Sequence, residues 1–386
     1  MKIIVYDPLY SSMGHFFRYN KYILTLLSDN PSIREIIYIS NEGEGASFDK
    51  ISSKIKSMSI PGIKSAQILS FQSYGFGKIK LYINMLWGYS RVIKYINESR
   101  CDLCFFTSNG MLPFWLAVNL KLRKKYIVSV ISLKWLYDKY SGKHLLFLAY
   151  RYFLRHTIRA LVTEECYIGA LVSRQVRHVS VLHDRFLHKI EPISSYGVNI
   201  SADNRTKLIT LGTLSHRKNP LEFVKLLRSI SERERTRLRY DIYGKSLDDT
   251  GELLRSLINN DSIINYHDQY IGDDEYERLM LHADFIVIPY DGSYTKFMTS
   301  GVMWDCFEYQ KPIICPDVEP FRHYISTYNI GFIYTPDTLG SIIRKLHQNK
   351  DKIGEMMRQN YKKLYEIQSY QNTSERFVSL VVESTR

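Results

Sequence analysis

Short apolar runs rich in β-branched residues alternate with helix-length segments along almost the whole chain. The runs predict strands at Lys2–Tyr6, Glu35–Ile39, Leu103–Thr107, Tyr126–Ile131, Ala160–Thr163, Val179–Leu182, Lys207–Leu211, Arg239–Tyr243, Ser262–Tyr266, Phe285–Pro289, Pro312–Cys315 and Gly331–Tyr334. Alternating strands and helices are typical of parallel sheets built from βαβ units. The sequence therefore predicts an α/β fold, and 386 residues are enough for two domains with separate cores.

A less periodic segment, 183–205, lies between the sixth and seventh predicted strands and contains proline, glycine and serine residues. We interpret it as a linker. It separates an N-terminal acceptor-binding domain over 1–190 from a second domain over 191–365. Both are expected to be doubly wound, Rossmann-like parallel sheets whose carboxyl ends face a cleft. A C-terminal helix over 366–386 is expected to pack back toward the N-terminal domain.

The charge is uneven between the two halves. Residues 1–190 contain 27 Lys and Arg against 12 Asp and Glu, whereas residues 191–386 contain 25 against 27. The basic residues are interleaved with aromatic ones in two predicted amphipathic helices, Tyr74–Tyr95 and Leu145–Arg159. Each helix alone reads as a core helix with solvated basic edges. The N-terminal half as a whole, however, predicts contact with an anionic membrane surface.

Targeting and redox signals are few. The N-terminus is too short and wrongly ordered for a signal peptide, and no stretch approaches the ~20 apolar residues that span a bilayer. Cys101 and Cys104 form one CxxC pair, but no second pair completes a zinc site. We therefore expect reduced, buried thiols in a cytoplasmic protein that lies peripherally on the inner face of the cell membrane.

The segment Ser300–Asp317 begins with a Ser-Gly pair after an apolar strand and a loop, and ends in Lys-Pro and a second apolar strand. A Ser-Gly pair at a helix start leaves backbone N–H groups without intrahelical partners and lets a ligand come close. These groups and the helix dipole favour phosphate. The segment predicts a phosphate site at Ser300 and Gly301, with Asp305 one turn further along, near the sugar of a nucleotide.

A strand, a glycine turn and a helix start follow one another over Leu208–Asn219. Gly212 lets the chain turn beneath a ligand, and Arg217 and Lys218 then place two cations where a diphosphate would lie. Lys218 supplies a point charge, and the guanidinium of Arg217 can fork two phosphate oxygens. A plain turn with two solvent-facing cations is the alternative interpretation.

Taken in chain order, the C-terminal motifs resemble the donor domain of nucleotide-sugar glycosyltransferases with the GT-B fold, most closely family 4. The motifs are Gly212 to Lys218, the strand ending at Gly244, the stretch from Tyr270 to Tyr290, and the segment from Ser300 to Pro312. That family has a lysine six residues after a glycine, as Lys218 follows Gly212. It also has a G-x6-L-x3-A-D-x4-P stretch, which begins here at Gly272. The resemblance spans about residues 207–325.

The resemblance implies roles for single residues. Lys218 matches the lysine that binds the donor diphosphate, and Asp305 matches the acidic residue that holds the donor ribose. The family usually has Glu there, so Glu308 is an alternative ribose ligand. A second Glu is usual eight positions earlier, where this chain has Phe297, which leaves a retaining or inverting outcome open. The expected donor site comprises Gly14, Gly212, Arg217, Lys218, Gly244, Tyr290, Ser300, Gly301, Asp305 and Glu308.

A loop after the first strand contains Gly14 and His15, and such a loop faces the cleft in GT-B enzymes. The pair resembles the Gly-His of inverting nucleotide-sugar transferases. Histidine has a pKa suited to a catalytic base, which makes His15 one candidate and Asp7 its rival. Helix capping or a core hydrogen bond for His15, and a turn for Asp7, are the structural alternatives. The donor-sugar histidine that many members have near Ser132–Trp135 is absent from this sequence.

Together these features predict a hexosyltransferase. It would move sugar from a nucleotide-diphosphate sugar to a membrane-associated, lipid-linked glycan in bacterial surface polysaccharide synthesis. Cations and amides would stabilise the leaving diphosphate without a metal, so no cofactor is expected. One alternative is a catalytically inactive GT-B-like scaffold. Another is a nucleic-acid-binding protein, which the lack of a recognition motif disfavours.

Overall fold

A computed structural model describes residues 1–8, 15–40, 48–61, 76–108, 112–130, 159–162, 178–181, 205–259, 261–292, 300–367 and 369–385. The chain divides into two compact units. The N-terminal unit comprises Met1–Phe186 and Tyr370–Arg386, and the C-terminal unit comprises Leu187–Lys296 and Ser300–Ser369. The division after Phe186 falls within the segment 183–205, of which the structure describes only Arg205.

The described strands of the N-terminal unit form one parallel sheet of seven, in the order β3-β2-β1-β4-β5-β6-β7. They are β1 (Lys2–Tyr6), β2 (Glu35–Ser40), β3 (Ile55–Ser59), β4 (Leu103–Phe106), β5 (Tyr126–Val130), β6 (Arg159–Val162) and β7 (Val179–Val181). The sequence analysis missed β3, because this edge strand buries only Ile55 fully and carries exposed polar residues. Its weak apolar pattern gives little signal.

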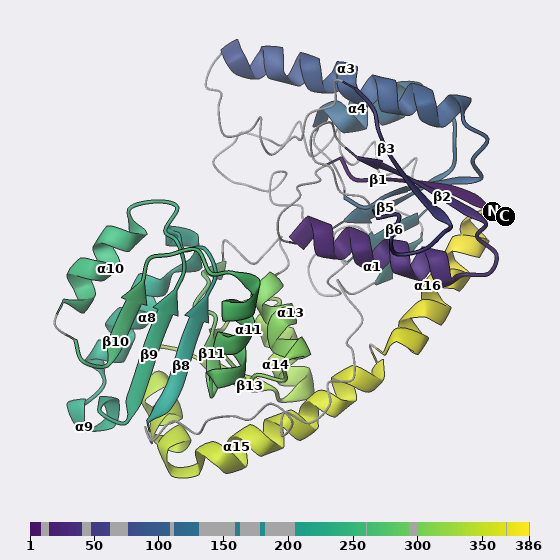
Figure 1. Ribbon diagram of the computed structural model, residues 1–386. Helices are drawn as coiled ribbons and strands as arrows, with labels where there is room; N and C mark the ends of the chain where they lie inside the picture. The colour runs from purple at the N-terminus through teal and green to yellow at the C-terminus, as the bar shows by residue number, and fades with distance from the viewer. Residues whose placement is uncertain are drawn as a thin grey trace. The chain divides into compact units, whose positions relative to one another are not determined.

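Helices cover both faces of this sheet (Figure 1). Successive residues of β1 point to opposite faces: Ile3 packs with α1 (His15–Asp29) and α16 (Tyr370–Thr385), and Ile4 packs with α3 (Phe76–Glu98) and α4 (Leu112–Lys121). The C-terminal helix α16 is therefore part of the N-terminal unit's core. None of the helices described is long and apolar enough to cross a membrane.

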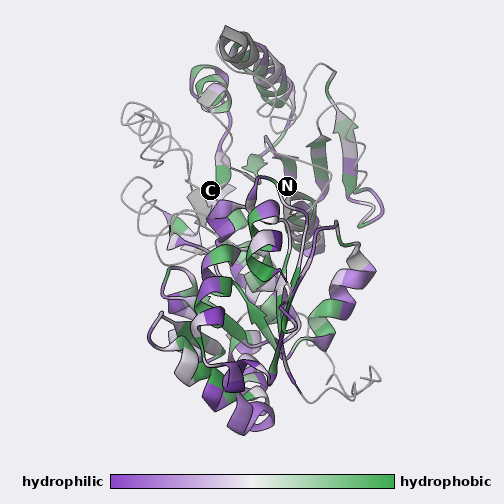
Figure 2. Ribbon diagram, turned by 90° about the vertical axis from the view of Figure 1, so that its left-hand side faces the viewer, coloured by the Kyte–Doolittle hydropathy of each residue, from purple (hydrophilic) through white to green (hydrophobic). Residues whose placement is uncertain are grey.

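The described strands of the C-terminal unit form a parallel sheet of six, in the order β10-β9-β8-β11-β12-β13. They are β8 (Thr206–Leu211), β9 (Leu238–Tyr243), β10 (Ile264–His267), β11 (Phe285–Val287), β12 (Ile313–Pro316) and β13 (Gly331–Tyr334). In Figure 2 these strands are mainly hydrophobic, while the helices around them alternate between hydrophobic and hydrophilic residues. That pattern is expected of a buried parallel sheet between two helical layers.

The helices of the C-terminal unit form two layers. One core cluster joins the sheet to α8 (Pro220–Ser229), α10 (Thr250–Ile258) and α15 (Leu339–Ile367), and another joins it to α11 (Asp273–His282), α13 (Gly301–Glu308) and α14 (Phe321–Tyr328). Two short elements, η3 (His216–Lys218) and α9 (Glu232–Arg235), complete the described helices.

The predicted fold class, two doubly wound parallel α/β domains, is confirmed. All twelve predicted strands are present, and their ends differ from the predicted ones by at most two residues. The predicted helix Tyr74–Tyr95 corresponds to α3. The predicted helix Leu145–Arg159 lies outside the described residues apart from Arg159, which begins β6.

Candidate nucleotide-sugar site

The strand order of the C-terminal sheet reverses between β8 and β11. In doubly wound sheets, ligands bind beyond the carboxyl ends of the strands at such a reversal. The chain leaves β8 at Gly212 and reaches Tyr290 three residues after β11. The residues that follow these two strands therefore form the candidate site.

Two glycine turns make the floor of the site. Gly212 has φ 98° and Gly244, at the end of β9, has φ 156°. A Cβ atom on Gly244 would lie 1.9 Å from the carbonyl oxygen of Gly212, so the two turns pack backbone against backbone. The N–H of Gly212 donates to the carbonyl of Tyr243 at 3.1 Å, and beyond the turns Leu214 pairs with Ser246. The contact between the two turns therefore leaves no room for a side chain at Gly244.

Lys218 lies above this floor. Its Nζ is 3.5 Å from the position that a Cβ on Gly212 would take, and 5.4 Å from the centre of the Tyr290 ring. Among the described residues its one hydrogen bond is a long one, 3.4 Å to Oγ1 of Thr213. Burial lowers the pKa of Lys218 to about 8. Because this is its one hydrogen bond, at most one of the three N–H donors of the Lys218 ammonium is satisfied by the described residues.

The element η3 presents Lys218 and Arg217 together. The side chain of Arg217 is exposed, and its carbonyl accepts the N–H of Asp291 at 3.2 Å, which ties η3 to the segment after β11. Asn219 then ends η3 with φ 51°, and Pro220 begins α8. Both cations predicted from the sequence thus lie on one short element at the reversal point.

The first turn of α13 borders the same space. Ser300 is buried and caps the helix, accepting the N–H of Met303 on its side-chain oxygen at 3.3 Å. A methyl carbon of Val302 lies 3.8 Å from the Cβ position of Gly212. The first N–H groups of a helix lack intrahelical partners, and the helix dipole is positive there. The structure therefore brings Gly212, Lys218 and the start of α13 together around a place suited to an anion.

Asp305 lies on the buried side of α13. Its side chain is 6% exposed and accepts the hydroxyl of Tyr276, from α11, at 2.7 Å. Burial, with the Asp305 carboxylate beside it, raises the pKa of Tyr276 well above its ordinary value, so Tyr276 is a fixed donor. Glu308, one turn further along, is half-buried at the end of the helix.

The far end of α13 is held by a tyrosine. The Tyr365 hydroxyl reaches the carbonyls of Phe307 and Glu308, both at 2.8 Å. Gln310 then turns the chain with φ 51°, a left-handed conformation that favours glycine. Gln310 therefore adopts a backbone conformation that glycine reaches at lower cost.

Of the site residues predicted in the N-terminal unit, only Asp7 has a described side chain. It is 1% exposed and accepts the Asn20 side-chain amide at 2.7 Å and the Ser108 hydroxyl at 2.5 Å. These bonds give Asp7 a structural role, and its role as a base stays a prediction. His15 begins α1, and its side chain is not described. Gly14, Phe297 and Ser132–Trp135 lie outside the described residues.

One group of possible metal ligands occurs among the described residues, beside η3. It consists of His216, Asp248 and Asp249, all exposed. Asp248 accepts the backbone N–H groups of His216 at 3.0 Å and of Thr250 at 3.1 Å, and Asp249 contacts the His216 ring. These contacts join the two loops that follow β8 and β9.

Sequence reasoning missed two residues of the site. It gave no role to Thr213 or to Tyr276. Thr213 could have been suspected from its position next to Gly212. Tyr276 gives no such signal, because its bond to Asp305 joins residues 29 positions apart and depends on how α11 packs against α13.

Comparison by sequence matches the chain to no family model and to no curated protein. Solved structures do match along the whole chain. Alr3699/HepE from Anabaena, in complex with UDP and glucose, matches 99% of this chain and 100% of its own at 13% identity and a TM-score of 0.69. Sucrose-phosphate synthase from Thermosynechococcus elongatus matches 99% and 98% at 13% identity and a TM-score of 0.68.

WaaG, described as a glycosyltransferase involved in lipopolysaccharide biosynthesis, matches 98% of this chain and 99% of its own at 14% identity and a TM-score of 0.61. Sequence identities this low establish the shared fold. The chain accordingly has the two-domain α/β fold of GT-B glycosyltransferases.

Proposed function

We propose that this protein is a metal-independent glycosyltransferase that binds a nucleotide-diphosphate sugar beyond the carboxyl ends of β8 and β11. The observation that carries the proposal is the position of Lys218. Its incompletely satisfied ammonium lies over the turn at Gly212, beside the first turn of α13. Anabaena HepE, which shares the fold, is solved with UDP-glucose.

The chemistry follows from the leaving group. Breaking the bond between sugar and diphosphate places negative charge on the phosphate oxygens. Lys218, the exposed Arg217 and the N–H groups at the start of α13 would stabilise that charge. The half-buried setting of Lys218 strengthens its interaction with an anion compared with the same pair in water.

The ribose would be held by Asp305 or Glu308. Asp305 accepts the Tyr276 hydroxyl on Oδ2, and its carboxylate would accept a ribose hydroxyl as well. Glu308 lies one turn further along α13 and has a longer side chain. If Asp305 holds the ribose, substituting Asp305 should lower donor affinity. If Glu308 holds it, substituting Glu308 should do so.

We propose a lipid-linked glycan at the inner face of a bacterial membrane as the acceptor, with the N-terminal unit on the membrane surface. Helix α3 supports this proposal. Ile83 and Trp87 are 50% and 66% exposed, and Arg91 and Lys94 continue the same face of the helix toward its C-terminus. Exposed apolar residues followed by cations suit the interface of an anionic bilayer.

The donor proposal is tested by measuring release of nucleoside diphosphate from UDP- and GDP-sugars, with and without polyprenyl-linked acceptors. Lys218→Met should lower turnover at least about 100-fold, because stabilisation of the leaving group is lost. Lys225→Met is the matched control, since Lys225 is an exposed lysine of the nearby helix α8. If wild-type protein binds no nucleoside diphosphate by calorimetry, the proposal fails.

The membrane proposal has its own test, co-sedimentation with phosphatidylglycerol vesicles. Replacing Ile83 and Trp87 with serine should lower vesicle binding several-fold, because both side chains leave water on binding. Leu253→Ser removes an exposed leucine, 43% accessible, from α10 of the other unit and should have no effect. Equal losses in both variants would argue against α3 as the membrane-binding face.

A further inference from the structure

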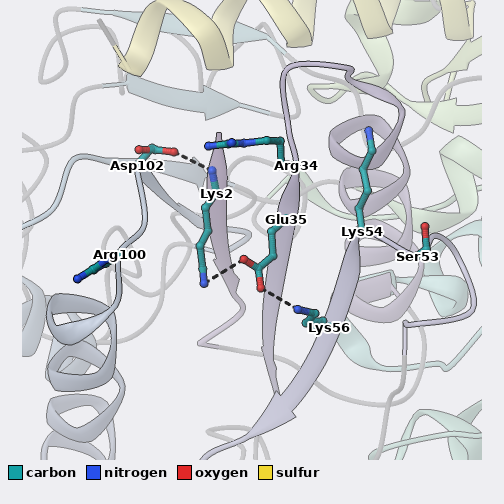
Figure 3. A pocket seen from close by; sticks show the side chains of 8 residues that line it. All are labelled: Lys2, Arg34, Glu35, Ser53, Lys54, Lys56, Arg100 and Asp102. Carbon is teal, nitrogen blue, oxygen red and sulfur yellow. Dashed lines mark hydrogen bonds and ion pairs between the residues drawn. The ribbon is translucent and has the colours of Figure 1, made fainter.

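A cavity of about 500 Å³ opens at the amino edge of the N-terminal sheet. Its side chains come from the starts of β1, β2 and β3 and from the segment before β4 (Figure 3). Five of the lining residues described are basic and two are acidic. Asp7 follows β1 at the carboxyl edge of the sheet, which is the opposite end of these strands. The cavity therefore does not include the candidate residue Asp7.

Two of the five cations are satisfied by one carboxylate. The Nζ atoms of Lys2 and Lys56 each lie 3.1 Å from an oxygen of Glu35 (Figure 3). Hydrogen bonds from these two lysines hold the pKa of Glu35 below its ordinary value. The second carboxylate, Asp102, accepts the backbone N–H of Lys2 at 2.7 Å. Both acids of the cavity are therefore engaged.

A third cation has a structural task. The Nζ of Lys54 donates to the carbonyls of Ser28 at 2.6 Å and Asn30 at 2.9 Å. These carbonyls lie at the C-terminal end of α1, where a helix leaves acceptors without partners. Lys54 closes that helix end, as a cation at the negative end of the helix dipole is expected to do.

The remaining cations, Arg34 and Arg100, have no such task. Both are exposed, and neither guanidinium bonds to any residue that the structure describes. Arg34 directly precedes β2 and Arg100 lies three residues before β4, and these two strands flank β1 in the sheet. Neighbouring strands are about 4.8 Å apart, so the two arginines enter the cavity from backbones about 10 Å apart. Long side chains can close that gap on a single ligand.

We propose that this cavity is a second phosphate-binding site, separate from the nucleotide-sugar site, with Arg34 and Arg100 as its ligand-binding residues. A guanidinium pairs with two phosphate oxygens at once, and two of them match the charge of a phosphate or diphosphate group. Lys2 and Lys56 share Glu35 and so add positive potential. The phosphate can belong to a lipid headgroup or to a soluble compound.

The test uses full-length protein carrying Lys218→Met, Ile83→Ser and Trp87→Ser, so that neither the donor site nor the exposed apolar residues of α3 contribute to binding. Inorganic pyrophosphate is titrated by calorimetry, and vesicles of phosphatidylglycerol or phosphatidylcholine are sedimented, both at about 0.15 M salt, where distant surface charges are screened. Adding Arg34→Gln and Arg100→Gln should weaken binding of pyrophosphate or of phosphatidylglycerol at least tenfold. Neither substitution removes a contact of the fold, so the variant should keep its melting temperature.

The matched control adds Arg233→Gln and Arg237→Gln, two exposed arginines of the C-terminal unit. It makes the same change in net charge and should alter binding less than twofold. If Arg34→Gln and Arg100→Gln weaken binding of pyrophosphate alone, the ligand is a soluble compound. If they weaken binding of phosphatidylglycerol vesicles alone, the ligand is a lipid. The site is refuted if neither probe binds, or if both double variants weaken binding equally. Nucleoside diphosphate binding to protein with Lys218 intact tests the donor site independently.

Discussion

Burial lowers the pKa of two lysines at opposite edges of the C-terminal sheet, but their hydrogen-bond partners differ. Burial lowers the pKa of Lys218, after β8, and of Lys311, before β12, to about 8 in each case. The Nζ of Lys311 donates to the carbonyls of Leu281 at 2.8 Å and Ala283 at 3.0 Å. Lys218 has one long bond, to Thr213. A lowered pKa therefore reports burial, and the number of satisfied donors separates a structural lysine from one available to a ligand.

The same criterion applies at the amino edge of the N-terminal sheet. Lys54 resembles Lys311, because both give their ammonium groups to carbonyls at a helix end. Arg34 and Arg100 resemble Lys218, because the described residues leave their donors available. Cations of the two kinds thus occur in both units.

The largest effects are expected from Lys218→Met and Lys311→Met. Lys218→Met should reduce turnover at least about 100-fold and leave the melting temperature equal or higher, because a poorly satisfied charge is removed. Lys311→Met should cost about 1–3 kcal/mol, because two buried carbonyls lose their donor, with turnover per folded molecule unchanged. Denaturant unfolding and nucleoside diphosphate release measure the two properties. The comparison is wrong if Lys218→Met lowers stability and Lys311→Met lowers turnover.

Gly244→Ala should have the next largest effect, about 3 kcal/mol of stability or more. Its Cβ would lie 1.9 Å from the Gly212 carbonyl oxygen, and its φ of 156° suits glycine. The control is Gly354→Ala within α15, where a Cβ meets nothing within 4 Å. It should stabilise by about 0.5–1 kcal/mol, since alanine favours helix. Urea unfolding measures the free energy of unfolding of both variants. A small loss of stability in Gly244→Ala would mean that the two turns are not in contact.

A smaller effect is expected at the ribose position. Asp305→Asn should weaken donor binding about 10-fold if Asp305 holds the ribose, whereas Glu308→Gln should do so if Glu308 does. Tyr276→Phe should weaken binding less than Asp305→Asn, because Tyr276 positions the carboxylate. Dissociation constants for UDP and GDP are the measurement. No change in either acidic variant would remove α13 from ribose recognition.

The smallest effect is a dependence on pH. Since the pKa of Lys218 is about 8, its charge falls as pH rises from 7 to 9, and diphosphate affinity should fall by up to about tenfold. A bound diphosphate favours the ammonium, so binding near pH 8.5 should take up protons. Calorimetry in buffers of different ionisation enthalpy measures this uptake. Lys218→Met should abolish the uptake, while Lys311→Met should retain it.

Stability without ligand should follow the opposite trend. The folded-state pKa of both lysines lies below the ordinary value of 10.5. Between about pH 8 and 10 these two lysines therefore bind more protons in the unfolded chain than in the folded one, and their contribution to the unfolding free energy should rise with pH in that window. Each methionine variant should remove part of the rise. The same dependence of stability on pH in the wild type and in both methionine variants would contradict the burial of these two lysines.

Sequence periodicity predicted most of the fold, and local motifs predicted the turn and the helix start that border the candidate site. The apolar runs located twelve strands, and the spacing from Gly212 to Lys218 and the Ser-Gly pair at 300–301 located the turn and the helix start. Local patterns carry this information because strand alternation, glycine turns and helix caps depend on neighbouring residues. The edge strand β3 was missed, since its side chains are mostly exposed and alternate weakly.

The sequence by itself determined the fold class, the glycine turn at Gly212 and the cap of α13, because each depends on residues close together in the chain. Tertiary structure decided which charged groups have partners. It joined Tyr276 to Asp305, gave Lys311 and Lys54 to helix carbonyls, and left Lys218, Arg34 and Arg100 with donors unused among the described residues. Satisfaction of a buried or clustered charge depends on distant segments that only packing brings within about 3 Å.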